Sequence, residues 1–259
     1  MRIDIIRPGN FLKDYVKCFW TLSHNGKPHT ERLFPVGEPQ MIFHSGEPFV
    51  ESHTPGQSTR QPEALVCGQL TTFTSVTTVN KSELFGISLQ PHALHTILKA
   101  SASQFTDRST DLTLIDKRYN ELHERIVEAP DTTEKVIVAE RYLREKIVNI
   151  KARNVRLIGE CLHRISQSPL YTLSDMAARF EISHRQMERI FLDHVGVSAR
   201  VFQKISRFNT ALRLIPASAS LTTIGYESGY FDQAHFSRSF KEHTGYSPGT
   251  YRQMLRDRG

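Results

Sequence analysis

The stretch that decides the fold runs from Leu221 to Pro248 and reads LTTIGYESGYFDQAHFSRSFKEHTGYSP. It is a degenerate copy of LSDMAARFEISHRQMERIFLDHVGVS, which begins at Leu173. Five identities keep a spacing of about 49 residues: Arg189 and Arg238, Phe191 and Phe240, His194 and His243, Gly196 and Gly245, and Ser198 and Ser247. Each copy is predicted to form a helix, a tight turn and a second helix. Two such units in tandem suit two successive turns of a DNA major groove.

The second helix of each unit has a defined start in the sequence. In the first unit Ser183 is a natural N-cap, and Gln186 three residues later completes a capping box, which predicts a helix over 184–194. In the second unit Asp232 caps a predicted helix over 233–243. Because a glycine follows each helix as a left-handed cap, both ends of each helix are predicted from neighbouring residues alone.

One helix is predicted on each side of the first unit. Apolar residues of 199–215 recur at helical spacing and stop at Pro216. At 1.5 Å per residue this connecting helix spans about 24 Å, enough to hold two small bundles about one turn of DNA apart. Upstream, another predicted helix carries a single apolar stripe of Val155, Ile158, Leu162 and Ile165.

Charge is distributed unevenly along the chain. The formal net charge is +6. From Lys151 onward there are 16 lysines and arginines against 9 aspartates and glutamates, whereas the part before it has 17 against 18. Attraction to phosphate depends on local charge, so only the C-terminal part is expected to meet a polyanion. A generally basic soluble protein is the alternative, but the charge coincides with the repeats.

The part before the repeats has a different texture. β-rich runs broken by turn-forming glycines and prolines predict strands near 15–22, 32–36, 40–44, 65–79 and 84–89. These runs predict a mostly antiparallel sheet or half-open barrel. Helical spacing then predicts two amphipathic helices over 112–126 and 136–150. The predicted fold class is therefore α+β, with a mostly antiparallel β domain and trailing helices over 1–151 and an all-α domain over 152–259.

The second repeat resembles the signature of AraC/XylS-type transcriptional regulators. The likeness rests on IGYESGYFDQAHFSRSFKEHTGYSP from Ile224, with Arg207 to Leu214 in the connecting helix. Gly225 and Tyr230 depart mildly from the usual alanine and phenylalanine. The resemblance implies an all-helical domain with two reading helices in adjacent major grooves. It also implies base-facing positions at Arg185, Glu188, Arg189, Gln233, Ala234, Ser237 and Arg238.

The front half is similar to an N-terminal domain that precedes this module in a subset of such regulators. The likeness is carried by Tyr15-Val16, Phe19-Trp20, Phe34-Pro35, Gly68 and the run from Gly86 to Pro91. This resemblance implies that the domain precedes the DNA-binding module in the chain, and it implies nothing about the chemistry of a ligand.

Candidate DNA contacts lie on the second helix of each unit: Ser183, His184, Arg185, Glu188, Arg189, Gln233, Ala234, His235, Ser237, Arg238 and Lys241. Such side chains hydrogen-bond base edges and phosphates, although a solvated helix face is the alternative for the arginines. Glu188 is a complication, because an acid repels phosphate. Three interpretations stay open: Glu188 accepts a hydrogen bond from a cytosine amino group, it forms an ion pair with Arg185 or Arg189, or the first unit has low sequence specificity.

No catalytic motif is recognised in the sequence. A phosphate-cradling glycine loop, GxSxG and HExxH are all absent. The three cysteines are too far apart for a CxxC metal knuckle: Cys18, Cys67 and Cys161. A cupin-like metal site is one interpretation of five histidines, but their spacing reveals no carboxylate partner: His29, His44, His53, His92 and His95. We therefore expect no catalytic residue, metal or cofactor.

Together these patterns predict a sequence-specific transcription regulator, more in keeping with an activator, that binds double-stranded DNA and RNA polymerase. A pocket for a small-molecule effector is predicted from four aromatic residues, with plain core as the alternative: Trp20, Phe34, Phe43 and Phe85. The helices over 112–126 and 136–150 either pair across a homodimer or lie on the sheet.

Other classes of function stay open at this point. One alternative is an architectural DNA-binding protein, and another is an N-terminal metal-dependent enzyme domain fused to a DNA-binding module. Because the sequence shows no charged-then-apolar leader and no apolar run of about 18 residues, we expect a cytoplasmic protein without membrane contact.

Overall fold

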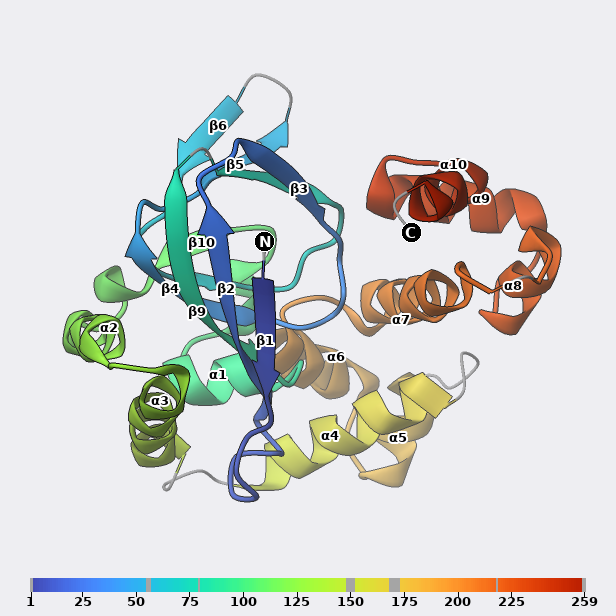
Figure 1. Ribbon diagram of the computed structural model, residues 1–259. Helices are drawn as coiled ribbons and strands as arrows, with labels where there is room; N and C mark the ends of the chain where they lie inside the picture. Colours follow the sequence, from blue (N-terminus) through green and yellow to red (C-terminus); the bar gives the residue numbers. More distant parts are fainter. Residues whose placement is uncertain are drawn as a thin grey trace.

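The computed structural model describes residues 2–54, 57–78, 80–147, 152–167, 173–217 and 219–257. Its strands are β1 (Arg2–Ile6), β2 (Val16–Asn25), β3 (His29–Leu33), β4 (Gln40–Gly46), β5 (Val50–Thr54), β6 (Gln57–Arg60), β7 (Ala64–Cys67), β8 (Thr74–Thr78), β9 (Lys81–Leu89) and β10 (Ser109–Asp111). They form a six-stranded sheet of order β1-β2-β9-β4-β7-β10 and a four-stranded sheet of order β3-β8-β5-β6 (Figure 1). Every pairing in the described residues is antiparallel.

The strand predictions succeed for the long runs and miss the short strands. The runs near 15–22, 32–36, 40–44 and 84–89 overlap β2, β3, β4 and β9. The run near 65–79 is two strands, because the chain leaves the six-stranded sheet after β7 and enters the other sheet as β8. The end of that run, Val79, lies outside the described residues. The short strands β1, β5, β6 and β10 were not predicted, but the α+β fold class is confirmed.

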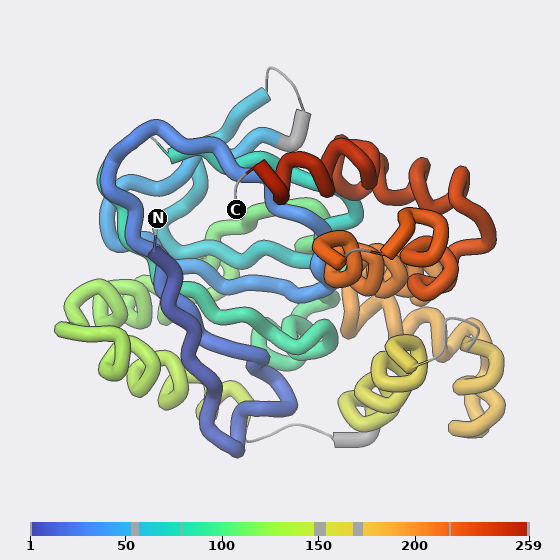
Figure 2. The backbone as a smooth tube through the Cα atoms, turned by 45° about the vertical axis from the view of Figure 1, so that its right-hand side comes forward, coloured from blue at the N-terminus to red at the C-terminus, as the bar shows by residue number. Residues whose placement is uncertain are grey.

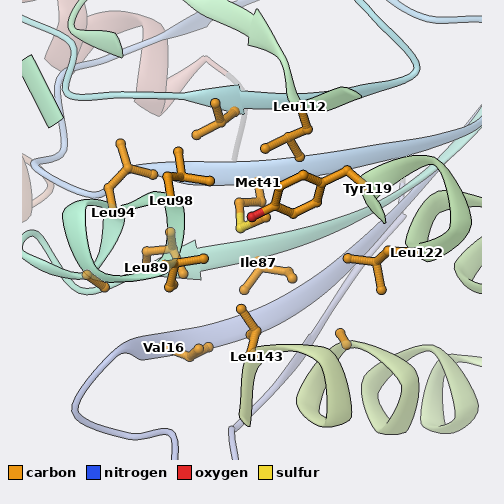
Figure 3. Packing of buried hydrophobic residues seen from close by; sticks show 14 of the residues in the cluster. Val16, Met41, Ile87, Leu89, Leu94, Leu98, Leu112, Tyr119, Leu122 and Leu143 are labelled. Atoms are coloured by element: carbon orange, nitrogen blue, oxygen red, sulfur yellow. The ribbon is translucent and has the colours of Figure 1, made fainter. Parts of the chain in front are cut away.

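The main core lies between the six-stranded sheet and three helices, α1 (Ala93–Leu98), α2 (Arg118–Glu128) and α3 (Thr132–Ile147). Figure 3 shows side chains of the sheet meeting those of the helices: Val16, Met41, Ile87 and Leu89 from the strands, and Leu94, Leu98, Tyr119, Leu122 and Leu143 from the helices. Because successive side chains of a strand point to opposite faces, the other face of this sheet is left for the space between the two sheets.

The amphipathic segments near residues 112–150 lie on the sheet of the same chain. The predicted helix over 112–126 is interrupted, because a short 3₁₀ turn, η2 (Leu112–Leu114), precedes α2. Asp116 lies in this break and accepts hydrogen bonds from Arg118 at 2.6 Å and from Lys146 at 2.9 Å. These cations hold the pKa of the Asp116 carboxyl well below its usual range. The second predicted helix corresponds to α3, and its last residues, 148–150, lie outside the described residues.

The C-terminal part is helical throughout the residues that the structure describes. Its helices are α4 (Ala152–Gln167), α5 (Leu173–Arg179), α6 (His184–Val195), α7 (Ala199–Leu214), α8 (Leu221–Glu227), α9 (Gln233–Thr244) and α10 (Pro248–Arg256). They build two bundles with separate cores, one around Met187 and Phe191 and the other around Phe236 and Phe240. The predicted domain boundary, between 151 and 152, falls beside residues 148–151, which lie outside the described residues. Among the described helices, none is long and apolar enough to span a bilayer.

The internal repeat is visible in the helix bounds. The first helices of the two units open at Leu173 and Leu221, which are 48 residues apart. Their second helices open at His184 and Gln233, which are 49 residues apart. The turn of the second unit is therefore one residue longer, although the paired helices have equal lengths.

We expect Gly68→Ala to lower the free energy of unfolding by about 1–3 kcal/mol, because an added Cβ would overlap the backbone carbonyl of Phe105, which cannot turn aside. Urea denaturation of the full chain measures this change. Gly159→Ala is the matched control, since nothing lies within 4 Å of its added Cβ and alanine favours a helix by about 1 kcal/mol over glycine. Equal loss of stability in both variants would contradict the tight contact at Gly68.

Candidate nucleic-acid interface

The second helix of the first unit, α6, begins at an exposed and well-capped turn. The Ser183 hydroxyl accepts a hydrogen bond from the Gln186 backbone N–H at 3.2 Å, as the capping box predicts. Met187 and Phe191 are fully buried, which sets the rotation of the helix about its axis. The opposite face is exposed and carries the predicted contacts His184, Arg185, Glu188 and Arg189.

An open groove of about 770 Å³ follows this face of α6 to the start of α7. It is lined by Leu173, Ser183, Arg185, Gln186, Glu188, Arg189, Leu192, Ser198 and Ala199. Glu188 lies 3.8 Å from His184 Nδ1, a pair that is charged only when the histidine is protonated. Among the described residues, no ion pair joins Glu188 to Arg185 or Arg189. The two arginines therefore keep their charges available to a ligand in the groove.

The second helix of the other unit, α9, also starts in solvent. Asp232 accepts a hydrogen bond from the His235 backbone N–H at 2.6 Å, which confirms the predicted cap. The exposed predicted contacts are Gln233, Ala234, Arg238 and Lys241. His235 and Ser237 are half-buried instead, and the His235 ring meets the buried Tyr230 ring edge-on at 5.3 Å. The exposed set leaves hydrogen-bonding and cationic side chains along one side of α9.

A residue that the sequence analysis missed, Thr222, lies beside the start of α9. Its hydroxyl donates a hydrogen bond to Gln233 Oε1 at 2.8 Å, from α8 across the turn. Spacing along one helix could not reveal this contact, because the two residues belong to different helices. Gln186 and Leu192 were also not predicted to line the groove at α6. A groove is formed by more than one element, so the spacing along α6 alone could not reveal it.

The C-terminal end of α6 is docked on the N-terminal part of the chain. The His95 and His194 rings lie 4.1 Å apart, and the Ser101 hydroxyl donates to Asp193 at 2.9 Å. The Thr106 hydroxyl donates to the Gly196 carbonyl at 2.6 Å. Figure 1 shows α6 next to α1. The contacts therefore hold the end of α6 that is farthest from its exposed first turn.

The C-terminal end of α9 is docked in the same way at a different place. The Arg32 guanidinium donates to the Thr244 carbonyl at 3.0 Å and lies over the Phe73 and Tyr246 rings, at 4.7 and 4.1 Å from their centroids. The Thr72 hydroxyl donates to the Glu242 carbonyl at 2.9 Å. Both second helices are thus held by equivalent ends, and their first turns stay exposed.

The connecting helix α7 packs against the segment that follows β3 (Figure 2). Asn209 donates to the Val36 carbonyl at 2.9 Å, and the backbone of Gly37 comes close to Phe202 and Ile205. Phe34 joins the second bundle instead of the sheet core, because its ring meets Phe208 and Tyr251 edge-on. This segment therefore contacts the connecting helix and the second bundle together.

A cavity of about 490 Å³ lies between the two sheets. Its walls include apolar side chains of both sheets and the segment after β3: Trp20, Leu22, Ile42, Phe49, Val76, Leu84, Phe34 and Val36. Polar groups also line it, among them Glu51, which is buried and accepts hydrogen bonds from Gln61 at 3.1 Å and from the Ser109 hydroxyl. The cavity is thus a mostly apolar space with a buried carboxylate in its wall.

Of the four residues predicted for an effector pocket, two line this cavity and two do not. Trp20 and Phe34 line the cavity. Phe43 and Phe85 do not, because both are fully buried on the opposite face of the sheet, in the core beneath the helices. Alternation explains the difference: their neighbours Ile42 and Leu84 face the cavity, and side chains one position along a strand face the other way.

The histidines considered for a metal site are spread over separate places. His29 lies 3.1 Å from Glu31, and His44 contacts Gln61 at 3.2 Å. His92 and His95 belong to the α1 region, and the side chain of His53 lies outside the described residues. Within the described residues, no three histidine, cysteine, aspartate or glutamate side chains are grouped so that they could hold a metal ion.

Comparison with known families divides the chain in two. Residues 176–254 match the model of a helix-turn-helix domain, and residues 4–111 match a domain of unknown function, DUF6597. The chain is 35% identical over 86 residues to the uncharacterized HTH-type transcriptional regulator YfiF of Bacillus subtilis, covering 33% of this chain and 27% of that protein. It is also 35% identical over 99 residues to the transcriptional activator NphR of Rhodococcus, covering 38% and 28%. The chain thus spans less than a third of the length of these relatives.

Solved structures match the chain at lower identity. The crystal structure of ToxT from Vibrio cholerae overlays with a TM-score of 0.48 at 14% identity, covering 92% of this chain and 98% of that one. The DNA-binding domain of AdpA in complex with a target DNA overlays with a TM-score of 0.36 at 23% identity, covering 40% and 94%.

We expect the unfolding free energy to fall as the pH drops from about 7 towards 4, because buried histidines stay neutral in the folded chain. Burial lowers the pKa of His92 to about 4, and burial, with His95 nearby, lowers the pKa of His194. Above about pH 7 both states are neutral at these residues, and below that the unfolded chain binds protons that the folded chain cannot accept.

Urea denaturation over this pH range measures the effect. His92→Gln should flatten the decline, because the neutral amide does not titrate. The exposed His163 offers a matched control, and His163→Gln should leave the decline as steep as in the wild type. A decline that is equally steep in His92→Gln would contradict a role for this group.

Proposed function

We propose that this chain, whose C-terminal part is an AraC-type double helix-turn-helix domain, is a sequence-specific DNA-binding regulator of transcription. One observation carries the proposal: α6 and α9 both expose a capped first turn with polar and cationic side chains, while their opposite ends are held by the N-terminal part. Helices of this kind enter a major groove by their N-terminal residues. The basic charge excess of this part of the chain supports the same partner, double-stranded DNA.

We propose that the two predicted domains have separate functions: 1–151 senses an effector or mediates self-association, and 152–259 binds DNA. Arg185, Arg189 and Arg238 would contact guanine edges or phosphates, and Lys241 would contact phosphate. Gln233 would contact a base edge. A role as activator would bring RNA polymerase as a further partner, and the work would be done in the cytoplasm, where bacterial DNA lies. The chain would act as a monomer or as a homodimer.

The cavity between the sheets is our candidate for an effector site. Its volume of about 490 Å³ falls in the range of about 300–1,000 Å³ that is typical of small-molecule sites. Apolar walls with the buried Glu51 carboxylate favour a small, largely apolar molecule that bears a hydrogen-bond donor. A cavity of this size supports a ligand site over a fully packed core, because native cores leave few such voids.

The wall of this cavity is also the docking edge for the helical domain. Arg32, Phe34 and Val36 line the cavity, and the same three residues contact α9, the second bundle and α7. A ligand that shifts these residues would therefore change how α9 and the connecting helix are held. Differential contact of this sort is what couples a ligand to a conformational equilibrium.

Two other functions are less well supported. An architectural DNA-binding protein would bind most sequences equally, which competition binding with unrelated duplexes would reveal. A metal-dependent enzyme domain finds no supporting cluster of ligands among the described residues.

We expect Arg238→Ala to lose about 1–3 kcal/mol of binding free energy at one base pair of the bound sequence and to flatten the base preference there. Fluorescence anisotropy with single-base variants of a selected site measures this loss. Arg125→Ala is the matched control, since Arg125 is an exposed arginine on α2, far from the reading helices, and should leave binding unchanged. A uniform loss on all sequences would mean that Arg238 contacts only phosphate.

We expect a small-molecule library to contain compounds that raise the unfolding temperature of the wild type, since a ligand at 100 times its Kd stabilises by about 2.7 kcal/mol. Val76→Phe, which places a ring in the cavity, should abolish the shift. Val127→Phe, on the exposed face of α2, should retain it. A shift that survives in Val76→Phe would place the ligand elsewhere, and a library without any stabilising compound would favour an oligomerising role for this domain.

A further inference from the structure

We propose that Thr222 positions Gln233 to read an adenine. The inference rests on the proposed function, because it concerns how α9 meets a base pair. The observation behind it is the hydrogen bond from the Thr222 hydroxyl to Gln233 Oε1, 2.8 Å long, across the turn between α8 and α9.

The elements that carry these two residues are fixed relative to each other. Thr222 is the second residue of α8, and its neighbours Ile224 and Gly225 are buried. Gly225 lets the helices approach closely, since an added Cβ there would lie 3.3 Å from the Phe236 ring of α9. Asp232 caps the first turn of α9, so the backbone at Gln233 is also held. The hydrogen bond therefore joins two rigid elements and restrains the Gln233 side chain between them.

The restrained amide has the right groups left over for adenine. An amide oxygen accepts two hydrogen bonds, and Thr222 uses one of them. The second lone pair of Oε1 can accept from the adenine N6 amino group while Nε2 donates to adenine N7, the bidentate pairing that glutamine makes in the major groove. Because Thr222 holds the oxygen towards α8, the amide meets the base in one orientation instead of sampling several. The entropy cost of ordering the Gln233 side chain is then met in the free protein and does not reduce the affinity for DNA.

The first unit has no equivalent of this pair. Its matching positions are Ser174 on α5 and His184 on α6, given the offsets of 48 and 49 residues. No hydrogen bond joins them in the part of the chain that the structure describes, and His184 instead lies 3.8 Å from Glu188. A neutral imidazole has one donor and one acceptor on different sides of the ring, so it cannot pair with one adenine edge as an amide does. The threonine-held amide is therefore specific to α9 among the two second helices.

The test uses the full chain and a bound sequence selected from a random duplex library. Affinities for every single-base variant of that sequence are then measured with the wild type, Thr222→Val and Thr222→Ser. Valine keeps the shape of threonine without the hydroxyl, whereas serine keeps the hydroxyl. We expect Thr222→Val to weaken the preference for adenine at one position about 10-fold and Thr222→Ser to retain it. Replacing that adenine by 7-deazaadenine, which lacks the N7 acceptor, should weaken the wild type about as much and the valine variant far less.

Ser174→Ala is the matched control, because it removes the hydroxyl at the equivalent position of the first unit. It should leave every base preference within about 2-fold of the wild type. Thermal unfolding of each variant checks that the fold is intact. A valine variant with the wild-type preference profile, or a serine variant that behaves like valine, would overturn the role of Thr222. A wild type that selects no sequence at all is a different result, since it would overturn the proposed function itself.

Discussion

The structure depends most on the docking of α6 and α9 by their C-terminal ends. Gly196 and Gly245 follow α6 and α9 in the left-handed conformation, with φ of +92° and +77°. At Gly196 an added Cβ would lie 3.0 Å from the Ala102 carbonyl, and at Gly245 it would collide with Arg32. The repeated glycines thus end the helices and admit the N-terminal part against them. The double attachment thus adds to the connecting helix in setting the separation of the two units.

The segment after β3 joins the two halves of the chain physically. Its residues contact α7 and the second bundle, Arg32 at the end of β3 contacts α9, and these same residues line the cavity between the sheets. Arg32 adds a charge-assisted hydrogen bond and two aromatic contacts at one point, so its loss would weaken the attachment of the end of α9. The wall of the cavity is thus connected to the end of α9 and to α7 through a few neighbouring residues.

The two helix-turn-helix units share a design but differ in the side chains of their exposed faces. Equivalent histidines, His194 and His243, are buried and donate to the carbonyl four residues earlier, at 2.9 and 2.6 Å, so the repeat preserves the inner face. At the outer face the first unit presents a histidine beside a glutamate, and the second presents a glutamine held by a threonine. Packing keeps the inner face alike, whereas the exposed face is free to diverge, because surface substitutions change stability little.

The sequence by itself determined the helical half, because helix starts, ends and apolar stripes depend on residues within four positions of each other. The caps at Ser183 and Asp232 and the connecting helix are where local patterns place them. Tertiary structure alone decided which aromatic residues face the cavity, since Phe43 and Phe85 differ from their neighbours only in the face of the sheet they occupy. It also decided the docking, where Arg32 meets Thr244 from 212 positions away. No periodicity in a chain records such a contact, because both partners acquire it only when separate elements pack together.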